Sequence, residues 1–421
     1  MKMKNRRGGP VTVSFSNFFS TSLLIAFAVI AAPAGAQTYE APPSFEASAI
    51  LGKRAKGLNY TVKSPVVSDG FLRAYNVETP YGAFRFEGDA FLRMRLRELA
   101  AINALGRIEE TDRFQESFQK ALKGPVDFAG DLVTKPGETV ERTVTGVGRL
   151  FGRVASGVRN VGKSSDNAAE ALLGVSKAKR EIAVELGVDP YTDFEPLAER
   201  LERAAQAAAF GGLTVKGLFA LVPGGAGLAV SSASAATDVA DIVKQHTASE
   251  LRDINRSRLV QAVGRKQSIG IFLDNRNYTP TDQTIIATAL HKFTKVSNVD
   301  AFLVRAAGVA ERSQAVFMRE RARVLARHHD EVEQFEAFKT VAEVPFAMSA
   351  SGALIGVFPI DDLAWTERAA GLMMRINEET STDGGIDSVK LYITGTATQA
   401  TKQELQKLGW LIEESVFPVK R

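Results

Sequence analysis

The stretch Gly157-Val-Arg-Asn-Val-Gly162-Lys163-Ser164 fits the pattern G-x-x-x-x-G-K-[ST], which in P-loop proteins wraps the phosphates of a nucleotide. Such a loop follows a buried strand and opens a helix, so that its backbone N–H groups point at the phosphates. The residues before Gly157 do not have the pattern of a strand. Their valines, together with Phe151, recur at spacings of three and four, which predicts a helix running through the match. We therefore interpret the match at Gly157, Gly162, Lys163 and Ser164 as accidental, and we predict neither a nucleotide nor another cofactor.

A second candidate for chemistry is the run HHDEVE, which begins at His328. His329 and Glu333 would lie one helical turn apart, and an imidazole and a carboxylate so placed can share a divalent ion or move a proton. The run stands among many arginines and glutamates, so we favour a solvated, charged helix face and predict no metal ligand and no catalytic residue. Gly395 follows a predicted strand and opens a helix, where backbone amides can bind an anion, although such turns are common.

Residues 140–163 have the pattern of a basic amphipathic helix. On a helical wheel the valines and Phe151 share one face, and the arginines lie on the opposite side. Such a helix can lie in a membrane interface with its arginines near anionic headgroups. Each glycine in the segment costs about 1 kcal/mol relative to alanine in a helix. The segment therefore needs a surface on which to fold, either lipid or the core of the protein. We favour the core, because an amphipathic helix of a globular protein usually docks there, and keep the membrane surface as the alternative. The candidate membrane contacts are Val147, Arg149, Phe151, Arg153 and Val154.

The stretch from Ala204 to Thr237 carries Lys216 as its only charge, and Pro223-Gly224-Gly225 interrupts it. This pattern predicts a Gly/Ala-rich helical hairpin. Small residues at four-residue steps allow helices to approach closely, both in membranes and in soluble proteins. We favour a pair of buried helices, because alanine, glycine and serine bury little apolar surface, and we keep a membrane-inserting hairpin as an alternative.

The beginning of the chain has the layout of a secretory signal peptide. Basic residues precede the apolar run SLLIAFAVIAAPAGA, and Ala34-Gly35-Ala36 is a small-residue cleavage site. The run is shorter than the roughly 20 residues of a membrane-spanning helix. We expect cleavage after Ala36 and export to the periplasm. The absence of cysteine excludes a disulfide framework and a thiolate metal site. Residues 1–36 hold four basic and no acidic residues, so their removal leaves 48 of each sign, and we expect no nucleic-acid partner.

The hydrophobic patterns predict a mainly helical α+β fold. A small antiparallel β element comes first, the central region is helical, and a small C-terminal α/β domain has the order β-hairpin, α, β, α, β. The expected segments are a signal peptide at 1–36, a flexible lead-in at 37–57, a β element with a long helix at 58–122, the Gly-rich basic segment at 123–165, a helical domain at 166–341 and the α/β domain at 342–421.

Three stretches, LFGRVASGVRNVG, ELGVDPYTDFEPL and LYITGTATQATKQELQKLGW, together resemble a group of exported bacterial proteins with no assigned activity. The resemblance covers most of the chain after Ala36, and it implies one recurrent architecture and no catalytic residues. We therefore predict a non-enzymatic periplasmic envelope protein, a binding or scaffolding module that contacts the membrane surface or an envelope protein, with residues 140–163 as the membrane contact. The alternatives are a hydrolase-like enzyme, with its site in the C-terminal domain or near His328 and His329, and a membrane-inserting protein that uses residues 204–237. The sequence indicates no oligomeric state.

Overall fold

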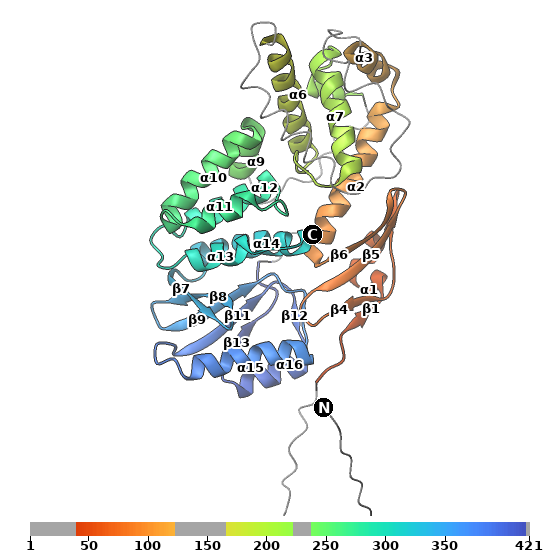
Figure 1. The fold of residues 1–421 in the computed structure, drawn as a ribbon. Helices are drawn as coiled ribbons and strands as arrows, with labels where there is room; N and C mark the ends of the chain where they lie inside the picture. Colours follow the sequence, from red (N-terminus) through yellow and green to blue (C-terminus); the bar gives the residue numbers. More distant parts are fainter. Residues whose placement is uncertain (1–38, 123–165, 222–236, 418–421) are drawn as a thin grey trace, which may run out of the picture. The chain divides into compact units, whose positions relative to one another are not determined.

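The computed structural model describes residues 39–122, 166–221 and 237–417. The signal-peptide prediction, the P-loop match, the candidate membrane contacts and the second half of the predicted hairpin lie outside these ranges. Residues 39–421 belong to one compact unit, in which the elements follow the chain from an N-terminal sheet through helices to a C-terminal sheet (Figure 1). The fold is a mixed α+β fold and mainly helical, as predicted.

The N-terminal element is an antiparallel sheet built around one long strand. This strand, β5, pairs along its whole length with β6, and on its other edge with β3 and β4. Alternation along β5 buries Tyr75 and Val77 against Phe86 and the first turns of the following helix. The strands are β1 (Ser44–Phe45), β2 (Lys56–Gly57), β3 (Tyr60–Val62), β4 (Val66–Ser68), β5 (Arg73–Thr79) and β6 (Gly82–Glu87).

The lead-in differs from the expectation of a flexible segment at residues 37–57. From Tyr39 onward it is part of the fold: β1 pairs with β4, and the short helix α1 (Ala47–Leu51) and a 3-10 turn (Gly52–Ala55) follow. The carboxylate of Glu40 accepts the N–H of Trp365. The composition of this segment, rich in alanine, proline and serine, predicted no local structure. The segment is ordered because β1 pairs with β4 and because Glu40 binds the distant Trp365.

The first helical group follows the sheet and holds a core of leucines, isoleucines and alanines. The long helix expected here is divided into α2 and α3 at Glu110-Thr111. Helices α2, α3 and α6 all pack against α7. The group consists of α2 (Asp89–Glu109), α3 (Asp112–Leu122), α6 (Asp166–Glu185), α7 (Glu195–Phe210), α8 (Val215–Phe219) and α9 (Thr237–Gln245).

The described part of the Ala204–Thr237 stretch packs inside this group. Ala204, Ala205 and Ala207 are fully buried in α7, and Leu218 of α8 joins the same core. The chain turns between the two helices at Gly211-Gly212, so this part is two helices and not one arm of a hairpin. In the described ranges, no helix combines the length and the apolar character that crossing a membrane requires.

The second helical group ends on a long helix that covers one face of the C-terminal sheet. Threonine side chains cap the starts of two of its helices, at Thr247 and Thr279, and Gly264 ends the first of these helices with a positive φ of 74°. The group consists of α10 (Ala248–Val263), α11 (Gln267–Asp274), α12 (Pro280–His291), α13 (Asp300–Ala307) and α14 (Arg312–Glu331).

The C-terminal sheet has the order β13-β11-β9-β8-β7, in which β9, β11 and β13 are parallel. One face packs on α13 and α14, and the other packs on α15 and α16 (Figure 1). The predicted hairpin, helices and strands are all present. The elements are β7 (Phe335–Val341), β8 (Val344–Ser349), β9 (Ala353–Phe358), β10 (Asp362–Leu363), α15 (Glu367–Ser381), β11 (Ser388–Ile393), β12 (Thr396–Ala397), α16 (Gln399–Lys407) and β13 (Leu411–Glu413).

One strand of this sheet was missed. We predicted helix up to residue 341, whereas residues 335–341 form β7, an edge strand that pairs with β8. The two strands meet in a tight turn at Ala342 and Glu343, whose φ angles are 47° and 63°. Such hairpin turns usually carry Asn-Gly or Asp-Gly, and without that signal the strand could not be recognised from the sequence. The first strand of the C-terminal sheet therefore begins at residue 335.

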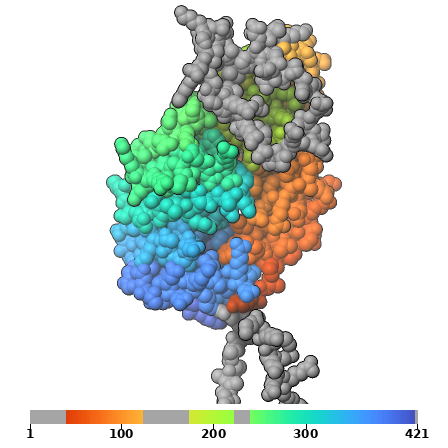
Figure 2. All heavy atoms as spheres, in the orientation of Figure 1, coloured from red at the N-terminus to blue at the C-terminus, as the bar shows by residue number. Residues whose placement is uncertain are grey.

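The N-terminal sheet is joined to the C-terminal domain by a charged contact, and the two regions also border each other in the space-filling view (Figure 2). Arg73 of β5 donates from Nε to the Asp362 carboxylate at 2.7 Å. Asp361 accepts the backbone N–H groups of Arg73 and Asp89, both at 3.0 Å. Burial and the neighbouring Asp89 raise the pKa of Asp361 well above its ordinary value. Each of these groups is engaged in holding the two regions together.

Candidate functional site

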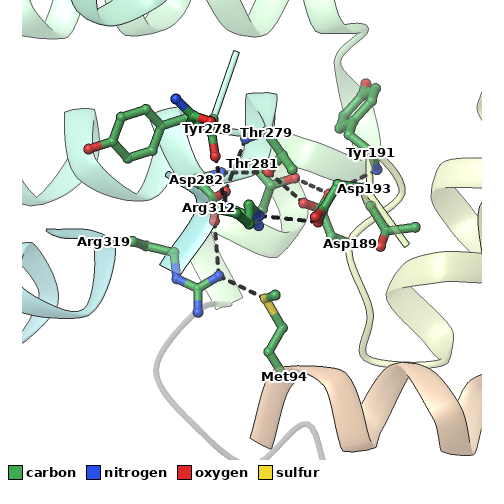
Figure 3. Close-up of polar contacts among 12 residues, drawn as sticks. Met94, Asp189, Tyr191, Asp193, Tyr278, Thr279, Thr281, Asp282, Arg312 and Arg319 are labelled. Atoms are coloured by element: carbon green, nitrogen blue, oxygen red, sulfur yellow. Dashed lines mark hydrogen bonds and ion pairs between the residues drawn. The ribbon is translucent and has the colours of Figure 1, made fainter. Parts of the chain in front are cut away.

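A connected group of buried charges lies where α2, the α6–α7 loop, α12 and α14 meet (Figure 3). Its centre is Asp282, which has no solvent exposure and lies in the first turn of α12. Thr279 caps this helix: its hydroxyl accepts the N–H of Asp282, and the Asp282 carboxylate accepts the N–H of Thr279. Pro280 supplies the fixed φ of the first helical position. The capping sequence thus fixes a carboxylate at a buried helix start.

Two arginines of α14 neutralise Asp282. Arg312 Nη1 lies 2.6 Å from one carboxylate oxygen of Asp282, and Arg319 Nη1 lies 2.9 Å from the other. Burial alone would raise the pKa of Asp282, but the two guanidinium groups outweigh burial and hold it well below its ordinary value. Arg312 and Arg319 are seven residues apart, two helical turns, so both reach the same side of α14.

The α6–α7 loop contributes a second carboxylate, Asp189, with a different surrounding. It accepts the hydroxyl groups of Thr279 and Thr281, both at 2.6 Å, and the N–H of Tyr191 at 2.9 Å. In the described part of the chain, its hydrogen-bond donors are hydroxyl and amide groups and no cation. Burial raises the pKa of Asp189, and the charge of Asp282 raises it further, to about 6, against the opposing effect of the hydrogen bonds.

The end of the same loop connects this cluster to α2. Asp193 accepts from Arg95 of α2 and, at 3.1 Å, from Arg312 of α14, and this pairing lowers the pKa of Asp193 in spite of burial. Arg95 also donates to Glu98 at 2.7 Å, and Glu98 accepts the hydroxyl of Thr192. The loop is therefore held between two helices by ion pairs at one end and by threonine hydroxyls at the other.

This arrangement of charges is suited to holding helices and a loop in place and less suited to catalysing a reaction. Asp193 and Asp282 are bound by arginines and stay ionised, which leaves Asp189 as the member that can gain or lose a proton near neutral pH. Within the described ranges no cluster of histidine, aspartate or glutamate side chains could hold a metal ion. Chemically, the cluster can fix three helices and a loop in one arrangement and can make that arrangement depend on pH.

The histidine pair is placed differently from the expectation of a solvated face. His328 is fully buried, stacked on Phe335 and 4.4 Å from the ring of Tyr392, and among the described residues neither of its nitrogens has a hydrogen-bond partner. The prediction was wrong for His328, because its side of α14 packs on the sheet. Glu333, which was paired with His329 in the sequence pattern, instead binds Lys390 at 3.2 Å.

His329 is also engaged in the fold. Its Nδ1 accepts the backbone N–H of Phe335 at 2.9 Å, and its ring packs on Phe293. The structure therefore does not pair His329 with Glu333, because each of them has another partner. A hydrolytic site near the pair finds no support in these contacts.

His328 makes the stability of the protein sensitive to acid. Burial lowers the pKa of His328 to about 4, so the stability it contributes is present above its ordinary pKa of 6.5 and is lost as the pH falls through 4. We expect the wild type to lose about 2 kcal/mol more than a His328→Phe variant between about pH 7 and pH 5. Urea unfolding at both pH values measures this difference, and equal losses would contradict the assignment.

The turn at Gly395 offers no free amides for an anion. The N–H of Thr394 donates to the carbonyl of Phe358, that of Gly395 to Ile360, and that of Thr396 to Asp361. A side chain at Gly395 would place a Cβ 1.9 Å from the Asp361 carbonyl, so glycine is required by the close approach of two backbone segments. The role of this glycine is packing.

The remaining candidates from the sequence fall outside the described residues. These are the P-loop match and the amphipathic segment, and their residues are Gly157, Gly162, Lys163 and Ser164, with Val147, Arg149, Phe151, Arg153 and Val154.

Sequence reasoning missed the cluster around Asp282, although two signals were present. Thr279-Pro-Thr-Asp282 is a capping box, and Asp189 and Asp193 flank a turn in ELGVDPYTDFEPL. Neither signal indicates which arginines from distant parts of the chain pair with these aspartates. Comparisons with protein-family models, with curated proteins and with solved structures find no match for this chain, so its function has to be argued from its own residues.

Proposed function

We propose that the protein is a non-enzymatic binding or scaffolding module of the cell envelope, exported to the periplasm, which contacts a membrane surface through residues 140–163. The observation that carries the proposal is where this segment is attached. It belongs to the connection between α3, which ends at Leu122, and α6, which begins at Asp166, and both helices pack against α7. The segment is thus attached at both ends to one helical group.

A second connection is attached to the same group. Residues 222–236 join α8, which packs against α6 and α7, to α9, which packs against α6. The Asp189–Asp193 loop between α6 and α7 is in turn held to α2 and α14 by the buried charge cluster. Because this support is held to α2 and α14, binding at residues 140–163 would be coupled mechanically to the rest of the protein.

Each of the two helices that flank the connection carries an exposed leucine. Leu122, at the end of α3, is 38% exposed, and Leu173, in the third turn of α6, is 59% exposed. The segment itself adds valines and Phe151 on one side and arginines on the other. Apolar side chains in the acyl region and arginines among anionic headgroups are the arrangement of an interfacial helix.

The proposal predicts that the protein sediments with anionic vesicles and that Val147→Asp with Phe151→Asp weakens this binding at least about tenfold, since each buried apolar side chain contributes about 1.5–3 kcal/mol. The measurement uses residues 37–421 and vesicles of phosphatidylglycerol mixed with phosphatidylcholine.

The matched control is Val332→Asp with Leu411→Asp, which changes two exposed apolar side chains in the C-terminal half, 54% and 60% exposed. The control variant should bind as the wild type does. Unchanged binding of the Val147/Phe151 variant, with circular dichroism like that of the wild type, would remove residues 140–163 from the contact.

The alternatives have weaker support. The part of the Ala204–Thr237 stretch that the structure describes is buried in the helical core, which does not favour a membrane-inserting hairpin. His328 is enclosed by aromatic rings, and the amides around Gly395 are engaged, so no observation in the C-terminal domain favours a hydrolase.

A further inference from the structure

Four arginines gather on one side of the contact between α2 and α14. Arg93 and Arg97 are one helical turn apart on α2, and Arg319 and Arg323 are one turn apart on α14. The helices touch at this point, because Arg319 Nη1 lies 3.3 Å from the sulfur of Met94. Two pairs of guanidinium groups therefore share one small region of the molecule.

The acidic groups near these arginines do not balance them. Glu320 pairs with Arg319 at 2.8 Å and with Arg323 at 3.3 Å, and Arg319 also pairs with Asp282. Within the described ranges neither Arg93 nor Arg97 forms an ion pair. Arg97 Nε donates to the carbonyl of Arg93, 3.4 Å away.

This excess is a matter of arrangement and not of composition. The chain after residue 36 carries equal numbers of basic and acidic residues, so a local excess of arginines has to be assembled by the fold. Burial lowers the pKa of Arg97, and the charges of Arg319, Arg93 and Arg323 lower it further against the opposing charge of Glu320. Arg97 remains exposed to solvent, and the Arg323 side chain is 38% exposed, so a ligand can reach both.

We propose that Arg93, Arg97 and Arg323 form a binding site for a phosphoryl anion, a phosphate monoester or diester. A guanidinium group presents its N–H donors as a planar fork that matches the oxygens of a phosphate. Groups from two helices can contact different oxygens of the same anion, and the negative charge offsets their mutual repulsion. Glu320 forms ion pairs with Arg319 and Arg323. Its single negative charge also acts on Arg93 and Arg97, and it cannot neutralise four guanidinium groups.

The same chemistry can come from a soluble phosphate compound or from a phospholipid headgroup, and the proposal does not rest on the membrane contact of residues 140–163. The experiment therefore has two arms. In the first, thermal unfolding is followed with inorganic phosphate or pyrophosphate, against sodium chloride of equal ionic strength. In the second, the protein is sedimented with phosphatidylglycerol vesicles or with phosphatidylcholine vesicles.

The variants are Arg97→Gln and the double variant Arg93→Gln with Arg97→Gln. The control is Arg368→Gln, an arginine of α15 that is 72% exposed. We expect the double variant to weaken binding of the anion at least about tenfold, as loss of charge-assisted hydrogen bonds does, while the control binds as the wild type. Without anion the double variant should unfold at the same temperature as the wild type or higher, because repulsion is relieved. A lower unfolding temperature without anion would instead indicate a structural role and overturn the proposal.

The result also separates the two sources. A rise in unfolding temperature with phosphate or pyrophosphate that the double variant loses supports a soluble ligand. Binding to phosphatidylglycerol vesicles that depends on Arg93 and Arg97 supports a headgroup, and this dependence should persist when Val147 and Phe151 are aspartate. No anion effect in either arm, or an equal effect in the double variant, would overturn the proposal.

Discussion

Replacement of Asp282 by asparagine is expected to lower the free energy of unfolding by about 3–5 kcal/mol, the usual cost of removing one partner from a buried ion pair. The change leaves Arg312 and Arg319 without the carboxylate that lies 2.6 Å and 2.9 Å from them. It also removes the charge from the first turn of α12, where the Asp282 carboxylate accepts the N–H of Thr279. Urea unfolding followed by circular dichroism at neutral pH measures the effect.

The matched control is Asp274→Asn, at the end of α11. Asp274 also pairs with an arginine, Arg252, but its side chain is 73% exposed. We expect this variant to lose at most about 1 kcal/mol, because solvent screens exposed ion pairs. If both variants lost the same small amount, Asp282 would not be the centre of the cluster.

Replacement of Asp189 by asparagine should raise the free energy of unfolding at neutral pH, whereas the change at Asp282 lowers it. Asp189 has a pKa of about 6 in the folded protein, against an ordinary value of 3.8, so the stability it contributes is present below 3.8 and is lost as the pH rises through 6. A pKa difference of about two corresponds to about 3 kcal/mol. The Asp189→Asn variant should therefore be more stable than the wild type by at most about 3 kcal/mol at about pH 7.5, and by less than about 1 kcal/mol at about pH 4.

The test is the difference in free energy of unfolding between this variant and the wild type across that range of pH. Comparing the two proteins at each pH removes the contribution of other groups, including His328, whose pKa is shifted in the opposite direction. The Asp274→Asn variant serves again as the control and should show a difference that does not change with pH. A gain that is the same at both ends of the range would show that Asp189 does not titrate as assigned.

The two aspartates illustrate how surroundings decide the behaviour of a carboxylate. Both lie at the junction of the α6–α7 loop with α12, and both accept hydrogen bonds from Thr279. Asp282 has two arginines and stays ionised, whereas Asp189 has hydroxyl and amide donors and a neighbouring negative charge. The pKa values of the two aspartates shift in opposite directions because Arg312 and Arg319 of α14 bind Asp282, whereas hydroxyl groups bind Asp189.

Secondary structure followed from the sequence wherever the signal was local. The helices capped by Thr366 and Thr398 follow from local capping and helical periodicity, and the predicted strand between them is β11, every second residue of which is buried. Strand β7 and the ordered lead-in were missed because both depend on pairing with a partner elsewhere in the chain.

The candidate sites were missed or misread for the same reason, because their contacts are made between distant parts of the chain. The charge of HHDEVE predicted a solvated face, and His328 is buried because the sheet that follows in the chain packs on its side of α14. The buried cluster could not be found, because Asp193 is 119 residues from Arg312 in the chain and 98 from Arg95. The arginines at 93, 97, 319 and 323 form one group only after α2 has packed on α14.

By itself, the sequence determined the mainly helical α+β class, most helix and strand positions and the order of the C-terminal elements, because periodicity and capping act between residues a few positions apart. Tertiary structure alone decided which carboxylates meet which arginines, and which polar side chains lose contact with water. Those outcomes depend on distances between segments far apart in the chain, and charge interactions depend steeply on both distance and burial.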